Sequence, residues 1–208
     1  MTIAGREFDL LLPADPDMFL EQLEERAAQG EATPDPYWAR LWPCAIELAA
    51  SILDASWTRG EAALEIGCGV GLAGLAGLHR GLNVTFSDLE ATAVALAREN
   101  AQRNGFPDSQ GVSFDWHEPP RLTYPIILAS DVLYDLKLHD VLLSLLDAML
   151  PGTGICWIGD PGRVHAERFV QSARARGFAV SLHDARGNEL RKPHTGRFQR
   201  LVLTRGDS

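Results

Sequence analysis

Short apolar segments alternate with longer amphipathic ones over most of the chain after residue 60. Runs rich in β-branched and aliphatic residues predict strands at 62–66, 83–88, 112–116, 125–131, 154–160, 178–184 and 198–205. Helical spacing fills the intervals between strands, except the one between 112–116 and 125–131 and the last one, where no helix separates the final two strands. The pattern predicts an α/β fold: a Rossmann-like, doubly wound, seven-stranded, mostly parallel sheet with helices on both faces. The last two strands are expected to form a hairpin-like edge with one antiparallel edge strand.

The first 55 residues have a different pattern. Residues 15–30 have helical spacing, with Asp15 or Asp17 available as a cap and Gly30 as a stop. A second helical pattern covers 38–53, with Pro43 near the start of its regular part. We expect one domain over residues 1–208, in which a helical extension or lid (1–55) precedes a Rossmann-like core (61–208).

Composition narrows the class of protein. The chain is 46% hydrophobic and 23% charged, as soluble globular proteins are, and no apolar run is long enough to span a membrane. Charged residues near the start argue against an export signal, and three widely spaced cysteines favour reduced thiols in a cytoplasmic protein. The net charge of −9 disfavours nucleic-acid binding, and the six histidines form no metal-ligand pattern.

A glycine-rich turn follows the first predicted strand, in the sequence LEIGCGVGLAGLAGL (64–78). No phosphate-binding GxxxxGK string occurs, but Gly69, Gly71 and Gly74 match a dinucleotide fingerprint, GxGxxG. The register is wrong for that fingerprint, because the strand ends at Ile66 and the first turn glycine should be Gly67. A turn that binds nothing also remains possible from the residues alone.

S-adenosyl-L-methionine suits this turn better than a dinucleotide. Glu65 would repel a pyrophosphate, whereas it would attract the ammonium of an amino-acid moiety. A glycine turn admits close backbone approach, and the helix N-terminus favours the carboxylate of that moiety. Asp88, which lies 23 residues after Glu65, ends the second strand, where a carboxylate can accept both ribose hydroxyls. Trp116, after the third strand, offers an aromatic plane for adenine.

Asp131 and Tyr134 follow the fourth strand and are the candidates for the acceptor side. A carboxylate there can position a lysine ammonium, and a tyrosine can orient an amine by a hydrogen bond or aromatic contact. The alternative is that Asp131 caps the next helix, although Asp135 is closer to the helix start. Trp38 and Trp42 lie four residues apart; Trp38 is expected in the core. The GDPGR segment (159–163) is either a simple turn or a loop that holds a polar substrate segment.

These motifs together resemble class I S-adenosylmethionine-dependent methyltransferases with the E-x-G-x-G-x-G motif. PYWARLWPCAIELA (36–49), FDW (114–116) and SDVLYD (130–135) are similar to the family 16 protein methyltransferases, and GDPGR resembles the branch that methylates lysines of the electron-transfer flavoprotein β subunit. The resemblance implies two catalytic residues, Asp131 and Tyr134. It also implies a cofactor set of Trp42, Glu65, Gly67, Gly69, Gly71, Asp88, Trp116 and Ser130.

The implied activity is methylation of lysine side chains of a protein substrate, by a monomeric cytoplasmic enzyme without metal, nucleic-acid or membrane partners. An adenine methyltransferase is disfavoured, because Val132 and Leu133 stand where such enzymes carry two prolines. Three alternatives stay open: a small-molecule, nicotinamide-like N-methyltransferase, a nicotinamide-dinucleotide-dependent oxidoreductase, and a non-catalytic binding module.

Overall fold

A computed structural model describes residues 1–14, 25, 28 and 36–205 of the chain. The helix expected over residues 15–30 therefore falls outside the described residues, apart from two isolated positions. A small hairpin that the sequence reasoning missed opens the chain, formed by β1 (Thr2–Ile3) and β2 (Arg6–Glu7). Its turn consists of Ala4 and Gly5, both with positive φ.

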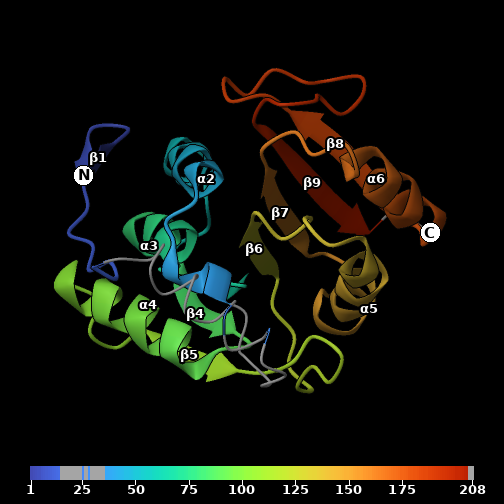
Figure 1. Cartoon of the computed structure of the whole chain (residues 1–208). Helices are drawn as coiled ribbons and strands as arrows, with labels where there is room; N and C mark the ends of the chain where they lie inside the picture. The colour runs from blue at the N-terminus through green and yellow to red at the C-terminus, as the bar shows by residue number, and fades with distance from the viewer. Residues whose placement is uncertain (15–24, 26–27, 29–35, 206–208) are drawn as a thin grey trace.

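One seven-stranded sheet forms the centre of the molecule (Figure 1). Its strands are β3 (Ala62–Ile66), β4 (Asn83–Asp88), β5 (Gln110–Ser113), β6 (Ile126–Ser130), β7 (Ile155–Asp160), β8 (Phe178–His183) and β9 (Gln199–Arg205). The strand order is β5-β4-β3-β6-β7-β9-β8. The five strands β5, β4, β3, β6 and β7 are mutually parallel. β9 pairs antiparallel with both β7 and β8. The expected fold and the hairpin edge are confirmed; the antiparallel strand itself, β9, lies one position inside the edge strand β8.

Helices cover both faces of the sheet (Figure 1). They are η1 (Pro36–Ala39), α2 (Pro43–Asp54), α3 (Leu72–His79), α4 (Ala91–Arg103), η2 (Leu136–Leu138), α5 (His139–Met149) and α6 (Ala166–Ala175). Successive strand residues point to opposite faces. Ala63 and Ile126 accordingly belong to one core cluster with residues of α2, α3 and α4, whereas Leu64 and Ile127 belong to a second cluster with residues of α5 and α6. The parallel strands are therefore apolar on both sides, and their polar residues gather at the strand ends.

The helix expected over 38–53 is shorter than its pattern. A 3₁₀ turn ends at Ala39, and α2 begins only at Pro43, with Trp42 as its N-cap in an extended conformation (φ −79°, ψ 140°). Proline disfavours the helical conformation for the residue before it, so Pro43 is tolerated at the first helical position but stops the helix from extending back through Trp42. Trp38 and Trp42 therefore do not share one helical face.

Gly74 allows α3 to lie close to the sheet. A Cβ at this position would meet the Phe86 ring at 2.4 Å and Glu65 Oε2 at 2.6 Å. We expect Gly74→Ala to lower the free energy of unfolding by about 1–3 kcal/mol, because overpacking outweighs the better helix propensity of alanine. Chemical denaturation measures this. Gly152→Ala is the matched control, since a Cβ there meets nothing within 4 Å; equal stabilities of the two variants would contradict the packing role.

Candidate active site

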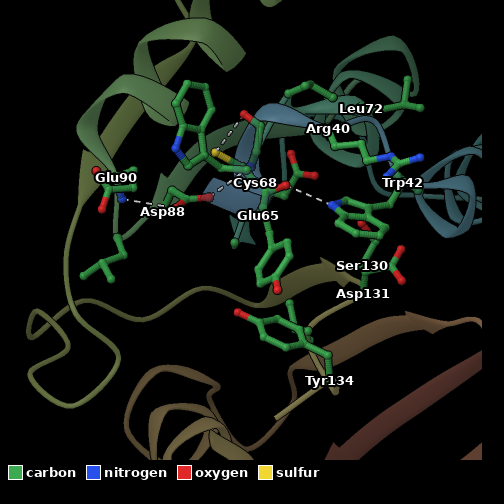
Figure 2. A pocket seen from close by; sticks show the side chains of 18 of the residues that line it. Arg40, Trp42, Glu65, Cys68, Leu72, Asp88, Glu90, Ser130, Asp131 and Tyr134 are labelled. Carbon is green, nitrogen blue, oxygen red and sulfur yellow. Dashed lines mark hydrogen bonds between the residues drawn. The ribbon is translucent and has the colours of Figure 1, made fainter. Parts of the chain in front are cut away.

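A cavity of about 240 Å³ opens at the carboxyl ends of β3, β4 and β6, the edge at which open α/β sheets bind ligands. Its volume is several times the roughly 30 Å³ share of one water molecule, so the cavity suits an organic ligand. Figure 2 shows Asp88 and Glu90 on one side, Ser130, Asp131 and Tyr134 on the other, and Glu65 between them. The predicted residues that line it are Trp42, Glu65, Gly67, Gly69, Asp88, Trp116, Ser130, Asp131 and Tyr134.

The glycine turn forms the floor of this cavity. Gly67 and Gly69 have φ of +59° and +49°, a backbone conformation that glycine adopts without strain. A Cβ on Gly69 would lie 3.1 Å from the backbone oxygen of Trp38. The Gly69 N–H donates to Asp88 Oδ2 at 3.0 Å, which ties the turn to the end of β4. The register that starts at Gly67 is therefore the one that shapes the cavity.

Gly71 is an exception among the predicted residues, because it does not line the cavity. It is the N-cap of α3, with φ +82°, and it is buried. A Cβ at Gly71 would lie 2.7 Å from the Ala97 Cβ and 3.1 Å from the Phe86 ring. The glycine at this position serves the packing of the turn against α4 and β4, outside the cavity lining, and its contact with the cofactor stays a prediction.

Glu65 occupies the N-terminus of α3. Its side chain is buried, and Oε2 accepts a hydrogen bond of 2.9 Å from the Gly74 N–H. A helix N-terminus is the usual anchor of a pyrophosphate. Here a carboxylate already takes that place, which argues strongly against a dinucleotide. The expectation that this helix end binds the carboxylate of a ligand is also revised, because Glu65 holds the Gly74 amide.

Burial raises the pKa of Glu65 to about 8, against the opposing effect of the helix amides. A carboxyl group with a raised pKa in the folded state stabilises the fold fully below its unfolded pKa, and this stabilisation is lost as the pH rises through the folded pKa. We therefore expect the stability of the wild type, relative to Glu65→Gln, to decrease between about pH 5 and pH 9. Denaturant unfolding of both proteins over this range measures it, and a constant difference would contradict it. A cationic ligand should shift the transition to lower pH.

Asp88 forms the β4 end of the cavity together with Glu90. Asp88 Oδ1 accepts from the Glu90 N–H at 3.1 Å, and Oδ2 accepts from Gly69, so both oxygens are fixed by the backbone. Each carboxylate oxygen can accept a second hydrogen bond. Trp116 lies just beyond β5 and half-buried, and its ring is 3.5 Å from where a Gly67 Cβ would be.

An aromatic cluster forms the other end of the cavity. Tyr37 packs edge-on against Trp42 (ring centroids 5.9 Å apart) and against Tyr134 (5.7 Å). Trp42 Nε1 donates to the Tyr37 carbonyl at 2.9 Å, and the Arg40 guanidinium lies 5.4 Å from the Trp42 ring. Tyr37 is 43% exposed and Tyr134 is 40% exposed, so this end of the cavity reaches the surface.

Asp131 belongs to a partly buried network of charges at the same end. Its Oδ1 is 3.0 Å from Arg163 Nη2, and Arg163 Nε is 3.8 Å from Oδ2 of the fully buried Asp160. Burial raises the pKa of Asp131, and the Arg163 guanidinium opposes this shift. Two carboxylates thus share one guanidinium, which leaves one net negative charge beside the aromatic cluster.

The GDPGR segment is both a turn and a support for the site. Asp160 Oδ1 accepts from the backbone N–H groups of Gly162 (2.8 Å) and Arg163 (2.9 Å), which closes the turn after β7. Arg163 then reaches Asp131. The turn therefore holds the Asp131 carboxylate. The helix-capping role considered for Asp131 belongs to Asp135, whose Oδ1 accepts from the Lys137 N–H at 2.8 Å.

Several lining residues were missed or misplaced by sequence reasoning. Trp38 lines the cavity instead of the core. Arg40, Glu90 and His117 also line it, and His117 Nδ1 is hydrogen-bonded at 2.7 Å to Asp115, a lining residue that the sequence already placed at the end of the third strand. Their position one or two residues from a predicted site residue was the available signal.

The described ranges contain neither a metal-binding cluster nor a membrane-spanning helix. No group of three or more histidine, cysteine, aspartate or glutamate residues there is placed to hold a metal ion. No helix in the same part of the chain has the length and apolar character that crossing a membrane requires. The three cysteines are buried and unpaired.

Comparison with known proteins identifies the family of the chain. The profile of a family described as lysine methyltransferase matches residues 31–173. Among curated proteins, the chain is 31% identical over 138 residues to the electron transfer flavoprotein β subunit lysine methyltransferase of Danio rerio (64% of this chain, 53% of that protein). It is 32% identical to a histidine protein methyltransferase 1 homolog of Dictyostelium discoideum (57% and 41%) and 32% identical to a human histone-arginine methyltransferase (50% and 60%). The chain spans about half the length of these relatives.

Solved structures agree on the fold. A TehB-like S-adenosylmethionine-dependent methyltransferase of Corynebacterium glutamicum superposes with a TM-score of 0.63 at 20% identity, over 93% of this chain and 100% of that one. A glycopeptide N-methyltransferase in complex with S-adenosylmethionine superposes with a TM-score of 0.62 at 13% identity (77% and 93%). The profile match covers more than half of the chain and includes every residue of the predicted site. The chain belongs to the lysine methyltransferase family of S-adenosylmethionine-dependent methyltransferases.

Proposed function

We propose that this protein transfers a methyl group from S-adenosyl-L-methionine to a lysine side chain of a protein. The observation that carries the proposal is the charge of the cavity. Asp88, Glu90, Asp115 and Asp131 line it, against one arginine, and Glu65 adds a carboxyl group whose ionised form a cationic ligand would favour. A cavity of this composition favours a cationic ligand and a cationic acceptor, and it disfavours the phosphates of a dinucleotide.

The residues on the β3 and β4 side suit the parts of this cofactor. Asp88, whose two oxygens are fixed by the backbone, would accept the ribose hydroxyls. Trp116 would stack on the adenine, and Gly67 and Gly69 would admit the ligand to the backbone. Glu65 would balance the positive charges of the methionine end. The bound cofactor supplies an electrophilic methyl group, and the protein binds and orients the two partners.

The residues on the β6 side suit a lysine acceptor. The net negative charge of the Asp131–Arg163–Asp160 network would attract the lysine ammonium to this end of the cavity. Tyr134, which is partly exposed beside it, would orient the amine, and the rings of Tyr37 and Trp42 would exclude water from the methylene chain. The amine must lose its proton before transfer, since only the neutral form has a lone pair. We assign Asp131 to positioning, because its carboxylate is engaged by Arg163 and only 9% of the residue is exposed.

A protein acceptor is supported by the exposed mouth of the cavity at Tyr37 and Tyr134, since a free small amine favours a closed pocket. The three curated relatives act on different side chains by name: lysine, histidine and arginine. Of these, neutral histidine fits the negative end least well. We propose a monomeric enzyme that acts in the cytoplasm on the electron-transfer flavoprotein β subunit or another protein of that compartment.

The test is the chemical identity of the methylated residue. The purified chain is incubated with methyl-labelled S-adenosyl-L-methionine and a cell lysate, and the labelled proteins are hydrolysed for amino-acid analysis. We expect the label in N-methyllysine. Label in methylhistidine or methylarginine would contradict lysine as the acceptor and identify histidine or arginine in its place. Label confined to small molecules would favour the nicotinamide-like alternative.

A further inference from the structure

The loop between β8 and β9 (residues 184–198) has a charge opposite to that of the whole chain. It carries four cationic residues and two carboxylates, whereas the chain has a net charge of −9. The exposed cations are Arg186, Arg191, Lys192 and Arg197. Within the described part of the chain, the side chains of Arg191, Lys192 and Arg197 make no ion pair or hydrogen bond. The loop therefore presents unneutralised positive charge to solvent.

The two carboxylates of the loop lie next to β8. Asp184 accepts from the backbone N–H groups of Arg186 and Asn188, both at 2.9 Å, and from the Asn188 side chain. Glu189 forms a backbone β-bridge with His183 at the end of β8, and its side chain is exposed. The second half of the loop, from Arg191 to Arg197, contains no acidic residue. We refer to Arg191, Lys192 and Arg197 as the basic loop patch.

The basic loop patch is fixed to the acceptor end of the active site. The Gly196 N–H donates to the Gly162 carbonyl at 2.8 Å, inside the turn that carries Arg163. Gln199 links the two segments further, because its Oε1 accepts from the His194 N–H at 2.8 Å and its Nε2 donates to Asp160 at 2.9 Å. The same turn holds Asp131 through Arg163. The loop and the acceptor end therefore belong to one connected structure.

Strand order gives the separation between the patch and the acceptor end. The cofactor side lies at β4 and β3, the acceptor side at β6, and the loop joins β9 and β8 at the same sheet edge (Figure 1). β9 is two strands from β6 and β8 is three, which corresponds to roughly 10–15 Å at about 4.8 Å per strand. An extended peptide covers that distance in about three to five residues, at roughly 3.4 Å per residue.

From this placement we infer that the basic loop patch is a docking surface for an acidic segment of the protein substrate, about three to five residues from the methylated lysine. The inference rests on the proposed function. Charge complementarity selects the occupant: the cavity is acidic and takes the lysine, whereas the patch is basic and takes carboxylates that flank it. Nucleic acid is the less suitable occupant, since the rest of the chain would repel it.

The experiment uses two short synthetic peptides with a single central lysine. One has glutamates about three to five positions away on both sides, and the other has glutamines at the same positions. Methylation by the wild type is compared with that by Arg191→Glu/Lys192→Glu. The matched control is Arg59→Glu/Arg121→Glu, which changes the net charge equally at two exposed residues outside the cavity and the loop. Fluorescence anisotropy measures the binding of both peptides and of a single-stranded RNA.

We expect the wild type and the control to prefer the glutamate peptide by about tenfold in kcat/KM, a preference that salt weakens and that the loop variant loses. No preference in the wild type, or the same preference in the loop variant, would overturn the docking surface. So would tighter binding of the RNA than of the glutamate peptide. If neither peptide is methylated, the lysine proposal fails. Anisotropy then tests the docking surface independently of methylation. Binding of the glutamate peptide that depends on the two loop cations supports the docking surface, and the absence of such binding overturns it.

Discussion

Replacement of Asp131 by asparagine is expected to lower kcat/KM for methyl transfer by about 100-fold, equivalent to about 2.7 kcal/mol of lost transition-state stabilisation. Asparagine keeps the shape of the side chain and an oxygen for the hydrogen bond from Arg163, 3.0 Å away in the wild type, but it removes the negative charge. The remaining Arg163–Asp160 pair then has no net charge, so the acceptor end no longer attracts the ammonium of an incoming lysine. Steady-state kinetics with a protein or peptide acceptor measures the loss.

The affinity for S-adenosyl-L-methionine should change by less than about threefold in the same variant, since Asp131 lies on the β6 side of the cavity, away from Asp88 (Figure 2). Asp135→Asn is the matched control. It removes a carboxylate from the same segment, keeps an oxygen for the cap of η2, and lies outside the cavity lining. Full activity of Asp131→Asn, or an equal loss in Asp135→Asn, would contradict the positioning role. Because Arg163 holds Asp131, Arg163→Met should show a similar loss with cofactor binding preserved.

Replacement of Asp88 by alanine is expected to weaken S-adenosyl-L-methionine binding by about 100-fold or more. Two hydrogen bonds to a charged group contribute roughly 1.5–3 kcal/mol each, and every 1.4 kcal/mol is a factor of ten in the dissociation constant. The variant also leaves the N–H groups of Gly69 and Glu90 without their carboxylate partner, which loosens the turn that lines the cavity. Isothermal titration calorimetry measures the affinity.

Asp88→Asn separates the loss of the charged hydrogen-bond acceptor for the cofactor from the loosening of the turn. Its amide oxygen still accepts one of the backbone hydrogen bonds, while the charge is lost. We expect it to bind the cofactor more tightly than alanine and more weakly than the wild type. Chemical denaturation of all three proteins checks that the fold survives. An affinity within threefold of the wild type for a folded Asp88→Ala would contradict the assignment of Asp88 to the ribose.

The sheet was predictable because its strands are buried on both faces. Continuous apolar runs such as 126–129 and 155–158 leave few alternatives to a buried strand, and the polar residues that end them define the ligand edge. Glu65, Asp88 and Asp131 were identified for this reason: each lies at or just after a strand end on that edge. The resemblance to the methyltransferase family then implied a catalytic or cofactor-binding role for each of these residues.

The remaining features depend on contacts between distant segments. No local pattern indicates that Trp38 would meet Gly69, or that Gly71 would face α4 instead of the cavity. The ion pair between Arg163 and Asp131 joins residues 32 positions apart, on turns that only the sheet brings together. The start of the regular helix at Pro43 was locally encoded and expected, whereas the apolar spacing that continues back to Trp38 set the start of the predicted helix too early.

The most direct test of the account is calorimetric titration of the intact chain with S-adenosyl-L-methionine, with its demethylated product, and with NAD. We expect one site that binds the first two with micromolar dissociation constants, about −8 kcal/mol, and does not bind NAD. Binding of NAD without binding of S-adenosyl-L-methionine would contradict it, and would restore Gly69, Gly71 and Gly74 as a dinucleotide fingerprint.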